Sequence, residues 1–291
     1  IYEFKNIKNK YKGVKKIGRT HLQDALPITI DQEISGYIES LNYCKDKIKH
    51  SLNDIYYIPC GGTAIGDGSN TPKGFDKKLI IEIQKETQLP FKISKNKFAS
   101  ISSFNAIQNT SNSLTLLATN LLKICTDFRL MSSGPQFGFN DIILNNDIVS
   151  SSIMAGKNNP VDLESLNMVC TKIIGLNNEI VILNSQGNFQ LNSFIPSIAN
   201  NIIESLDLIT DGCNNFTKNF FKNIEYNKKK LHNDNKNTLS ISTYLVPYIG
   251  YEETKKLLNY AKKNKINLIE ANNKLNYISE KKLLKILKLT K

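Results

Sequence analysis

Long apolar periodicities are the feature of this sequence that most constrains its fold. In residues 103–130, 161–183 and 198–220, apolar side chains recur at three- and four-residue steps. That spacing places them on one face of an α-helix. Helices of roughly 25 to 30 residues are about 40 Å long, well beyond the globular average. The sequence therefore predicts an all-α fold built on a long-helix bundle that is shared between subunits.

A fourth long helix is predicted to run from about residue 29 to residue 57. Thr29 and Gln32 have the spacing of a capping box, and Ile34, Tyr37 and Leu41 follow at helical steps. Residues 1–16 alternate lysine with apolar residues. We expect them to be the exposed end of a segment that begins upstream, because the chain starts with Ile rather than Met.

Composition divides the chain near its C-terminal end. A run of Asn and Lys occupies residues 223–237, which predicts a boundary. We expect a central long-helix bundle domain over residues 1–228, with the oligomer core and the active-site loops, and a small helical C-terminal domain over residues 229–291. Helices at 252–263 and 279–287 are its clearest elements, and their lysine-rich faces indicate solvated surface.

Several classes of protein do not fit this composition. The sequence contains no run of about 18 or more apolar residues, the length that a membrane-spanning helix requires. Five widely spaced cysteines without a Cys-x-x-Cys pair favour reduced thiols and a cytosolic or organellar interior. The three histidines are isolated from one another, so we expect no metal: His21, His50 and His232.

The net charge of +12 raises the question of nucleic acid. Apart from Arg19 and Arg129, however, every basic residue is a scattered lysine. A nucleic-acid surface usually contains arginine for bidentate contacts. We therefore expect no nucleic-acid partner. A general bias of amino-acid usage toward lysine explains the net positive charge better.

A glycine-rich loop at residues 60–71 imitates two nucleotide-binding motifs. A Walker loop requires Gly-Lys-Ser/Thr where Gly66-Asp67-Gly68 stands. A dinucleotide fingerprint requires a preceding strand, which the expected helical surroundings do not offer. Nucleotide binding is not predicted.

A polar loop at residues 149–160 is the strongest candidate site. It combines three serines, Gly156 and Lys157, and it ends at Asn159-Pro160 just before a periodic apolar segment. Asn159 has the character of a helix cap and Pro160 that of a first helical residue. A helix N-terminus beside a lysine suits a carboxylate or phosphate. The same residue types also occur in ordinary loops.

The earliest histidine, His21, stands between Thr20 and Leu22-Gln23. Histidine is common at polar turns as well as at acid-base sites. Considered alone, His21 leaves both interpretations open.

Four segments together resemble the fumarase/aspartase superfamily, and class II fumarase within it. They are the His21 segment, Ser132-Ser133-Gly134-Pro135, residues 151–160 and Gly187-Asn188-Phe189-Gln190-Leu191-Asn192. The resemblance runs from about Gly18 to the C-terminus, and the family's N-terminal third is expected to be missing. Thr20-His21-Leu22-Gln23-Asp24 favours fumarase, because the similar aspartases carry Gln at the histidine position.

The resemblance implies reversible hydration of fumarate to (S)-malate in the tricarboxylic acid cycle, without a cofactor. It implies that Ser151 is the base that takes the proton from carbon. It also implies that His21, paired with Glu164, activates the water or protonates the hydroxyl. The implied substrate-binding residues are Thr20, Ser152, Lys157, Asn158 and Asn159. The implied partners are fumarate and malate, in a homotetramer whose active sites are shared between subunits. This chain alone is expected to be inactive.

Three positions depart from the family pattern. Ser150 stands at a usual Gly, Ala155 at a usual Pro, and Gln136 where Arg often follows Ser-Ser-Gly-Pro. These departures keep open the alternative of a truncated non-catalytic homologue with a structural role. An aspartate ammonia-lyase is a further alternative, because few residues distinguish it from fumarase. The expected location is cytoplasmic, or the mitochondrial matrix if the source is eukaryotic.

Overall fold

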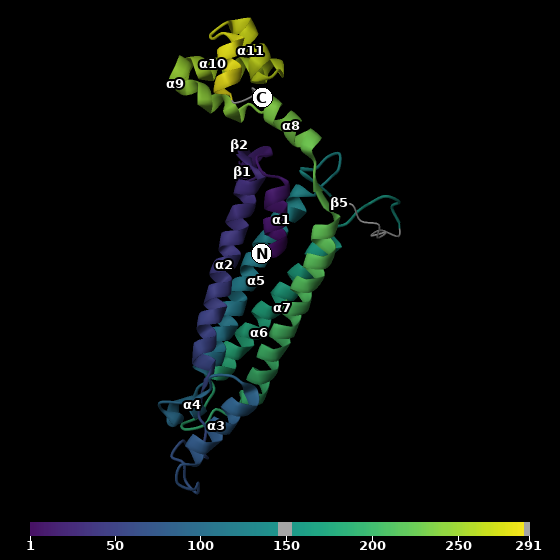
Figure 1. Cartoon of the computed structure of the whole chain (residues 1–291). Helices are drawn as coiled ribbons and strands as arrows, with labels where there is room; N and C mark the ends of the chain where they lie inside the picture. The colour runs from purple at the N-terminus through teal and green to yellow at the C-terminus, as the bar shows by residue number, and fades with distance from the viewer. Residues whose placement is uncertain (145–152, 288–291) are drawn as a thin grey trace. The chain divides into compact units, whose positions relative to one another are not determined.

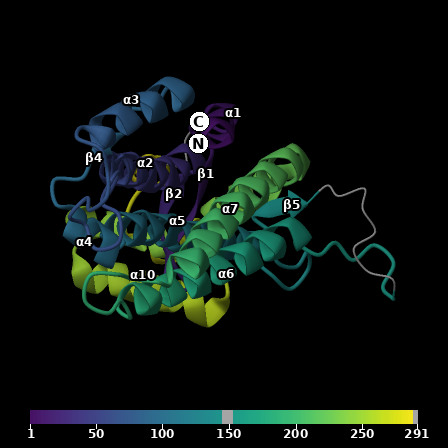
Figure 2. The same ribbon diagram turned by 90° about the horizontal axis from the view of Figure 1, so that it is seen from below.

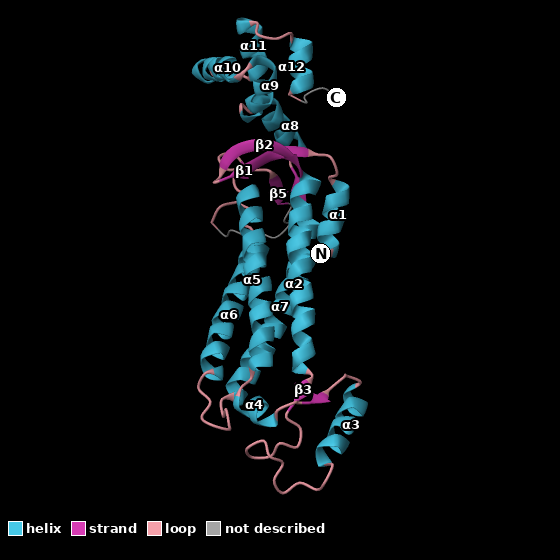
Figure 3. Ribbon diagram, turned by 90° about the vertical axis from the view of Figure 1, so that its left-hand side faces the viewer, coloured by secondary structure: helices cyan, strands magenta, loops and turns pink. Residues whose placement is uncertain are grey.

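Helix dominates the computed structural model of the chain, which describes residues 1–144 and 153–287 (Figure 3). These residues form twelve α-helices, one 3₁₀ helix and six short strands. The predicted all-α class is confirmed. The chain divides into two compact units: the first comprises Ile1 with residues 38–130 and 144–224, and the second comprises residues 2–37, 131–143 and 225–291.

The first unit consists mainly of long helices that lie side by side (Figure 1). They are most of α2 (Ile30–Ile55), α5 (Asn105–Met131), α6 (Val161–Asn184) and α7 (Ile195–Asn223). All four were predicted from apolar spacing, and all four are confirmed. Figure 2 shows α6 and α7 packed along each other.

The core of this bundle follows the predicted periodicity. On α5, the buried apolar residues recur at three- and four-residue steps: Leu114, Ala118, Leu121, Ile124, Cys125, Phe128 and Met131. The ring of Phe128 meets that of Phe220 edge-on, with centroids 5.3 Å apart. Edge-to-face aromatic pairs add to the gain from burial, so these rings join α5 to α7.

Smaller elements complete the first unit: β3 (Tyr57–Ile58), α3 (Phe75–Thr87), β4 (Lys92–Ile93) and α4 (Lys97–Ser102). The strands β3 and β4 pair in parallel. The expectation of wholly helical surroundings for the glycine-rich loop is therefore wrong, because β3 precedes it. Its glycines still lack the Gly-x-Gly-x-x-Gly order, and the loop folds on itself, with the amides of Gly66 and Gly68 donating to the carbonyl of Gly62.

The second unit contains a hairpin of β1 (Lys15–Thr20) and β2 (Gln23–Thr29). The predicted capping box at the start of α2 is confirmed. The amide of Thr29 donates to Oε1 of Gln32 at 2.9 Å, and the amide of Gln32 donates to Oγ1 of Thr29 at 3.3 Å. The expectation that residues 1–16 are exposed is wrong. They include α1 (Tyr2–Lys10), whose Phe4 and Ile7 are buried, because its apolar residues share one helical face.

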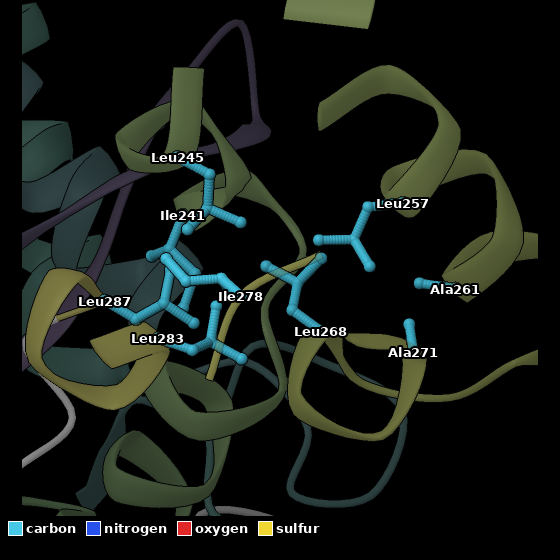
Figure 4. Close-up of a cluster of buried hydrophobic side chains, with 9 residues drawn as sticks. All are labelled: Ile241, Leu245, Leu257, Ala261, Leu268, Ala271, Ile278, Leu283 and Leu287. Carbon is cyan, nitrogen blue, oxygen red and sulfur yellow. The ribbon is translucent and has the colours of Figure 1, made fainter. Parts of the chain in front are cut away.

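The chain's C-terminal part has its own hydrophobic cluster (Figure 4). The helical elements here are α8 (Lys228–Asn237), η1 (Ser240–Leu245), α9 (Val246–Ile249), α10 (Tyr251–Asn264), α11 (Leu268–Leu275) and α12 (Glu280–Ile286). The two predicted helices, α10 and α12, are present. Nine buried residues from η1 onward form the cluster, with Leu245, Leu257 and Leu283 fully enclosed. A domain boundary at residue 228 stays a prediction.

Helix α6 is long and apolar enough to cross a membrane by length and composition, the one such helix among the described residues. One such helix is weak evidence, because core helices of soluble proteins pass the same test. Leu163, Leu166 and Ile173 are buried on it, and α7 packs against it. Burial against α7 accounts for part of this apolar character, whereas Met168 and Ile182 are exposed.

Candidate active site

The His21 segment forms the tip of the β1–β2 hairpin. Thr20 pairs with Gln23, so His21 and Leu22 are the only turn residues. Both have left-handed backbone conformations, with φ of 53° and 59°. A two-residue turn with two positive φ angles normally favours Asn-Gly, and left-handed backbone outside glycine costs free energy. The exposed tip is therefore strained where the sequence predicted a catalytic residue.

Gly18 lets the two strands approach just before this tip. The register shifts between Ile17 and Arg19. A Cβ atom on Gly18 would lie 2.8 Å from the carbonyl oxygen of Leu26. Any side chain at this position would force the strands apart. Glycine therefore permits the β-bulge at this register shift, and the bulge sets the direction of Arg19 and Thr20.

The buried carboxylate of Asp141 binds Arg19, which lies just before the hairpin turn. Asp141 is fully buried, and its Oδ2 lies 2.6 Å from Nη1 of Arg19. Burial alone would raise the pKa of Asp141, but the hydrogen bonds from Arg19 and Lys230, with the charges of Lys16 and Arg19, outweigh burial and lower it. Asp141 is therefore ionised at neutral pH.

A tight loop that begins at Ser133 places Asp141 beside Arg19. The amide of Phe139 donates to Oγ of Ser133 at 3.0 Å, and the amide of Asn140 donates to the Ser133 carbonyl at 2.9 Å. A Cβ on Gly138 would lie 2.3 Å from the carbonyl carbon of Ser133. The segment noted in the sequence as Ser132-Ser133-Gly134-Pro135 thus closes a loop that delivers Phe139 and Asp141 to Arg19.

The second part of the candidate site lies at the N-terminus of α6. The predicted Asn159 cap is wrong in detail: Pro160 occupies the N-cap position, and no side-chain hydrogen bond from it caps the helix. Pro160 has no side-chain acceptor, so acids in the first turn, Asp162 and Glu164, complement the helix dipole instead. Burial raises the pKa of Asp162.

Lys157, Asn158 and Asn159 precede this helix in the polar loop. Lys157 is exposed, and its amide closes a turn by donating to the carbonyl of Met154 at 3.2 Å. Nδ2 of Asn158 donates to the carbonyl of Leu144 at 3.1 Å, which ties the loop to the end of β5 (Ile142–Leu144). Ser150, Ser151 and Ser152 lie outside the described residues.

Glu164 has a cationic partner on α5. Nη2 of Arg129 lies 3.2 Å from Oε1 of Glu164, and both side chains are partly exposed. Glu164 points from the first turn of α6 toward the last turn of α5, where Arg129 also complements the carboxyl end of that helix.

The structure describes the candidate site in two parts. Thr20 and His21 belong to the second unit, whereas Lys157, Asn158, Asn159 and Glu164 belong to the first. Sequence reasoning missed the supporting residues Arg19, Asp141 and Arg129. A signal existed: of 38 basic residues only two are arginine, and each holds a carboxylate of the candidate site or its support.

Within residues 1–144 and 153–287, no group of three His, Cys, Asp or Glu side chains is placed to hold a metal ion. Three of the cysteines lie on neighbouring helices of the first unit: Cys125, Cys170 and Cys213. Burial raises the pKa of Cys125 and of Cys170 to about 12 each. Such thiols are inert core residues.

Comparison with solved structures shows that this bundle of long helices has the fold of fumarases and delta-crystallin-like lyases. The structure of class II fumarase from Schistosoma mansoni superposes with a TM-score of 0.93 at 35% identity, covering 98% of this chain and 63% of that one. The family model described as "Lyase" matches residues 1–175. The chain belongs to this lyase family.

Curated relatives are similar along most of the chain. Fumarate hydratase class II of Prochlorococcus marinus is 42% identical over 271 residues, which cover 93% of this chain and 58% of that protein. Mitochondrial fumarate hydratase of Dictyostelium discoideum is 41% identical over 263 residues, 90% of this chain and 54% of that protein. The chain thus spans less than two thirds of the length of these relatives.

Proposed function

We propose that this chain is part of a fumarate hydratase that interconverts fumarate and (S)-malate as a step of the tricarboxylic acid cycle. The observation that carries the proposal is His21 at the tip of a turn, in a chain about 41% identical to named fumarate hydratases. An imidazole can act as a general acid or base toward water, as hydration of a double bond requires.

In the malate-to-fumarate direction, the alkoxide of Ser151 takes the proton from the carbon beside one carboxylate and becomes the neutral hydroxyl. The electron pair left behind moves into that carboxylate, which becomes an aci-carboxylate dianion. Lys157 and Asn159 stabilise this charge, aided by the positive end of α6. The electrons then return to form the double bond, and the hydroxyl leaves with a proton from His21 as water.

Glu164 would orient the imidazole of His21, as a carboxylate does for histidine in other acid-base sites. Thr20, Ser152 and Asn158 would bind the substrate carboxylates. The exposed turn of Lys157 and the flexible Gly156, with φ of 78°, support a loop that adapts to a small dianion. No cofactor takes part in this scheme.

The same proposal includes a homotetramer with active sites shared between subunits. Large apolar side chains are exposed on α6 and α7: Met168 at 68%, Ile182 at 60%, Ile203 at 57% and Leu206 at 43%. An exposed apolar surface of this kind supports association through the long helices. The proposed location is the cytoplasm, or the mitochondrial matrix in a eukaryote.

The substrate test uses the full-length protein with fumarate and, separately, with aspartate. Malate formation from fumarate without ammonia release from aspartate is the expected result. Ammonia release from aspartate would instead assign an aspartate ammonia-lyase. Turnover of neither substrate would favour a non-catalytic homologue whose helices serve assembly.

A further inference from the structure

Asp141 is the centre of a buried charge network in the second unit. Its carboxylate meets three cations: Arg19 Nη1 at 2.6 Å and Lys16 Nζ at 3.6 Å from Oδ2, and Lys230 Nζ at 3.1 Å from Oδ1. Lys16 also pairs with Glu33 at 2.8 Å, and Lys230 with Asp234. A buried ion pair contributes little net stability relative to apolar packing, so stability alone does not explain why this carboxylate is here.

Arg19 is the member of the network closest to the candidate chemistry. It directly precedes Thr20 and His21, and its guanidinium lies 4.4 Å from the centroid of the Phe139 ring. Its Nε is 3.6 Å from Oδ1 of Asp24, the residue paired with it across the hairpin. A planar guanidinium can stack and hydrogen-bond at once, which a lysine cannot do.

The turn beyond Arg19 requires such support. His21 and Leu22 both have positive φ, and strained backbone persists only where its surroundings over-determine it. Strand pairing fixes the turn from one side, through Thr20 and Gln23. On the other side, Arg19 is held by its ion pair with Asp141 and by its contact with the ring of Phe139. We call these two contacts the clamp on Arg19.

We propose that Asp141 is a positioning residue for catalysis, which acts through Arg19 to hold the Thr20–His21 turn in its working conformation. This inference rests on the proposed function, because it assigns the turn a role in turnover. The competing account is that Asp141 only anchors the C-terminal segment through Lys230 of α8.

The decisive experiment compares variants of the full-length protein in fumarate hydration. Asp141→Asn and Arg19→Lys should each lower kcat by about 10- to 100-fold, because a displaced catalytic group costs about that much. Their combination should be no worse than the more severe single change, since both break one clamp. Lys230→Met, the matched control on the other side of Asp141, should retain kcat within about threefold of wild type.

Arg19→Lys keeps the test decisive if Asp141→Asn fails to fold, because the lysine preserves the charge opposite Asp141. Independent, additive losses for Arg19→Lys and Asp141→Asn would overturn the proposal. So would a loss in Lys230→Met as large as that in Asp141→Asn.

Hydrogen exchange of the peptide covering residues 19–23 provides a readout without substrate. Exchange should be faster in Asp141→Asn and in Arg19→Lys than in wild type, and unchanged in Lys230→Met. Unchanged exchange in the first two variants would overturn the positioning role. If the wild-type protein ignores fumarate, the proposed function fails, whereas the exchange result still decides whether Asp141 holds the turn.

Discussion

Nη2 of Arg129 lies 3.2 Å from Oε1 of Glu164, and the two side chains are 43% and 45% exposed. An ion pair this exposed contributes about 0 to 1 kcal/mol to stability. Glu164→Gln should therefore change the free energy of unfolding in urea by less than about 1 kcal/mol. If Glu164 orients His21, the same variant should lose at least about tenfold in turnover.

Glu179→Gln, an exposed change on the same helix, is the matched control and should preserve both quantities. Full turnover in Glu164→Gln would remove Glu164 from the proposed mechanism.

The strained turn predicts an unusual stabilising substitution. Leu22 has φ of 59° and is 58% exposed. Leu22→Gly removes a left-handed penalty of about 1–2 kcal/mol, partly offset by the greater freedom of glycine in the unfolded chain. Urea denaturation should show a gain of roughly 0.5–1 kcal/mol. Leu26→Gly, at a partly exposed strand position, should destabilise instead, and equal losses in the two variants would contradict the turn geometry.

Acid should weaken the protein through Asp141. The pKa of Asp141 is lowered in the folded state, so its stabilising contribution is complete above its unfolded value of about 3.9 and is lost as pH falls through the lower folded pKa. Asp141→Asn should be less stable by about 3 kcal/mol at pH 7, and this difference should shrink below about pH 4. Denaturation measured across that range is the check. A constant difference would show that Asp141 is not the titrating group.

The buried thiols should resist alkylation in the native state. Burial, with a contribution from neighbouring cysteines, raises the pKa of Cys125 to about 12, so almost no thiolate is present at pH 8. Iodoacetamide should modify Cys213, which is partly accessible, before Cys125 and Cys170. Peptide mass spectrometry before and after unfolding measures the order. Early modification of Cys125 would contradict its burial.

The sequence predicted the elements whose stability is local or periodic. Apolar steps such as Leu114, Leu121 and Phe128 imply a helix because one face must be buried. The capping box of Thr29 and Gln32 was predicted for the same reason: both partners lie within one turn and need no tertiary contact.

The hairpin and its supports were missed because they depend on distant partners. Lys16 is 2% exposed within β1, where its polarity argues for a surface position. Its ion pairs with Glu33 and Asp141 make its burial acceptable. Asp141 is 122 residues from Arg19, so no local pattern joins them. The catalytic assignments of His21, Lys157 and Glu164 came from resemblance, and they stay predictions.

Malate formation from fumarate by the full-length protein, compared with that by its His21→Asn variant, measures whether His21 takes part in hydration. Asparagine tolerates the left-handed conformation at position 21, so the variant should fold as wild type does while it loses proton transfer. We expect hydration by the wild type and a loss of about 100-fold or more in the variant. Equal turnover in the two proteins, or none in the wild type, would contradict it.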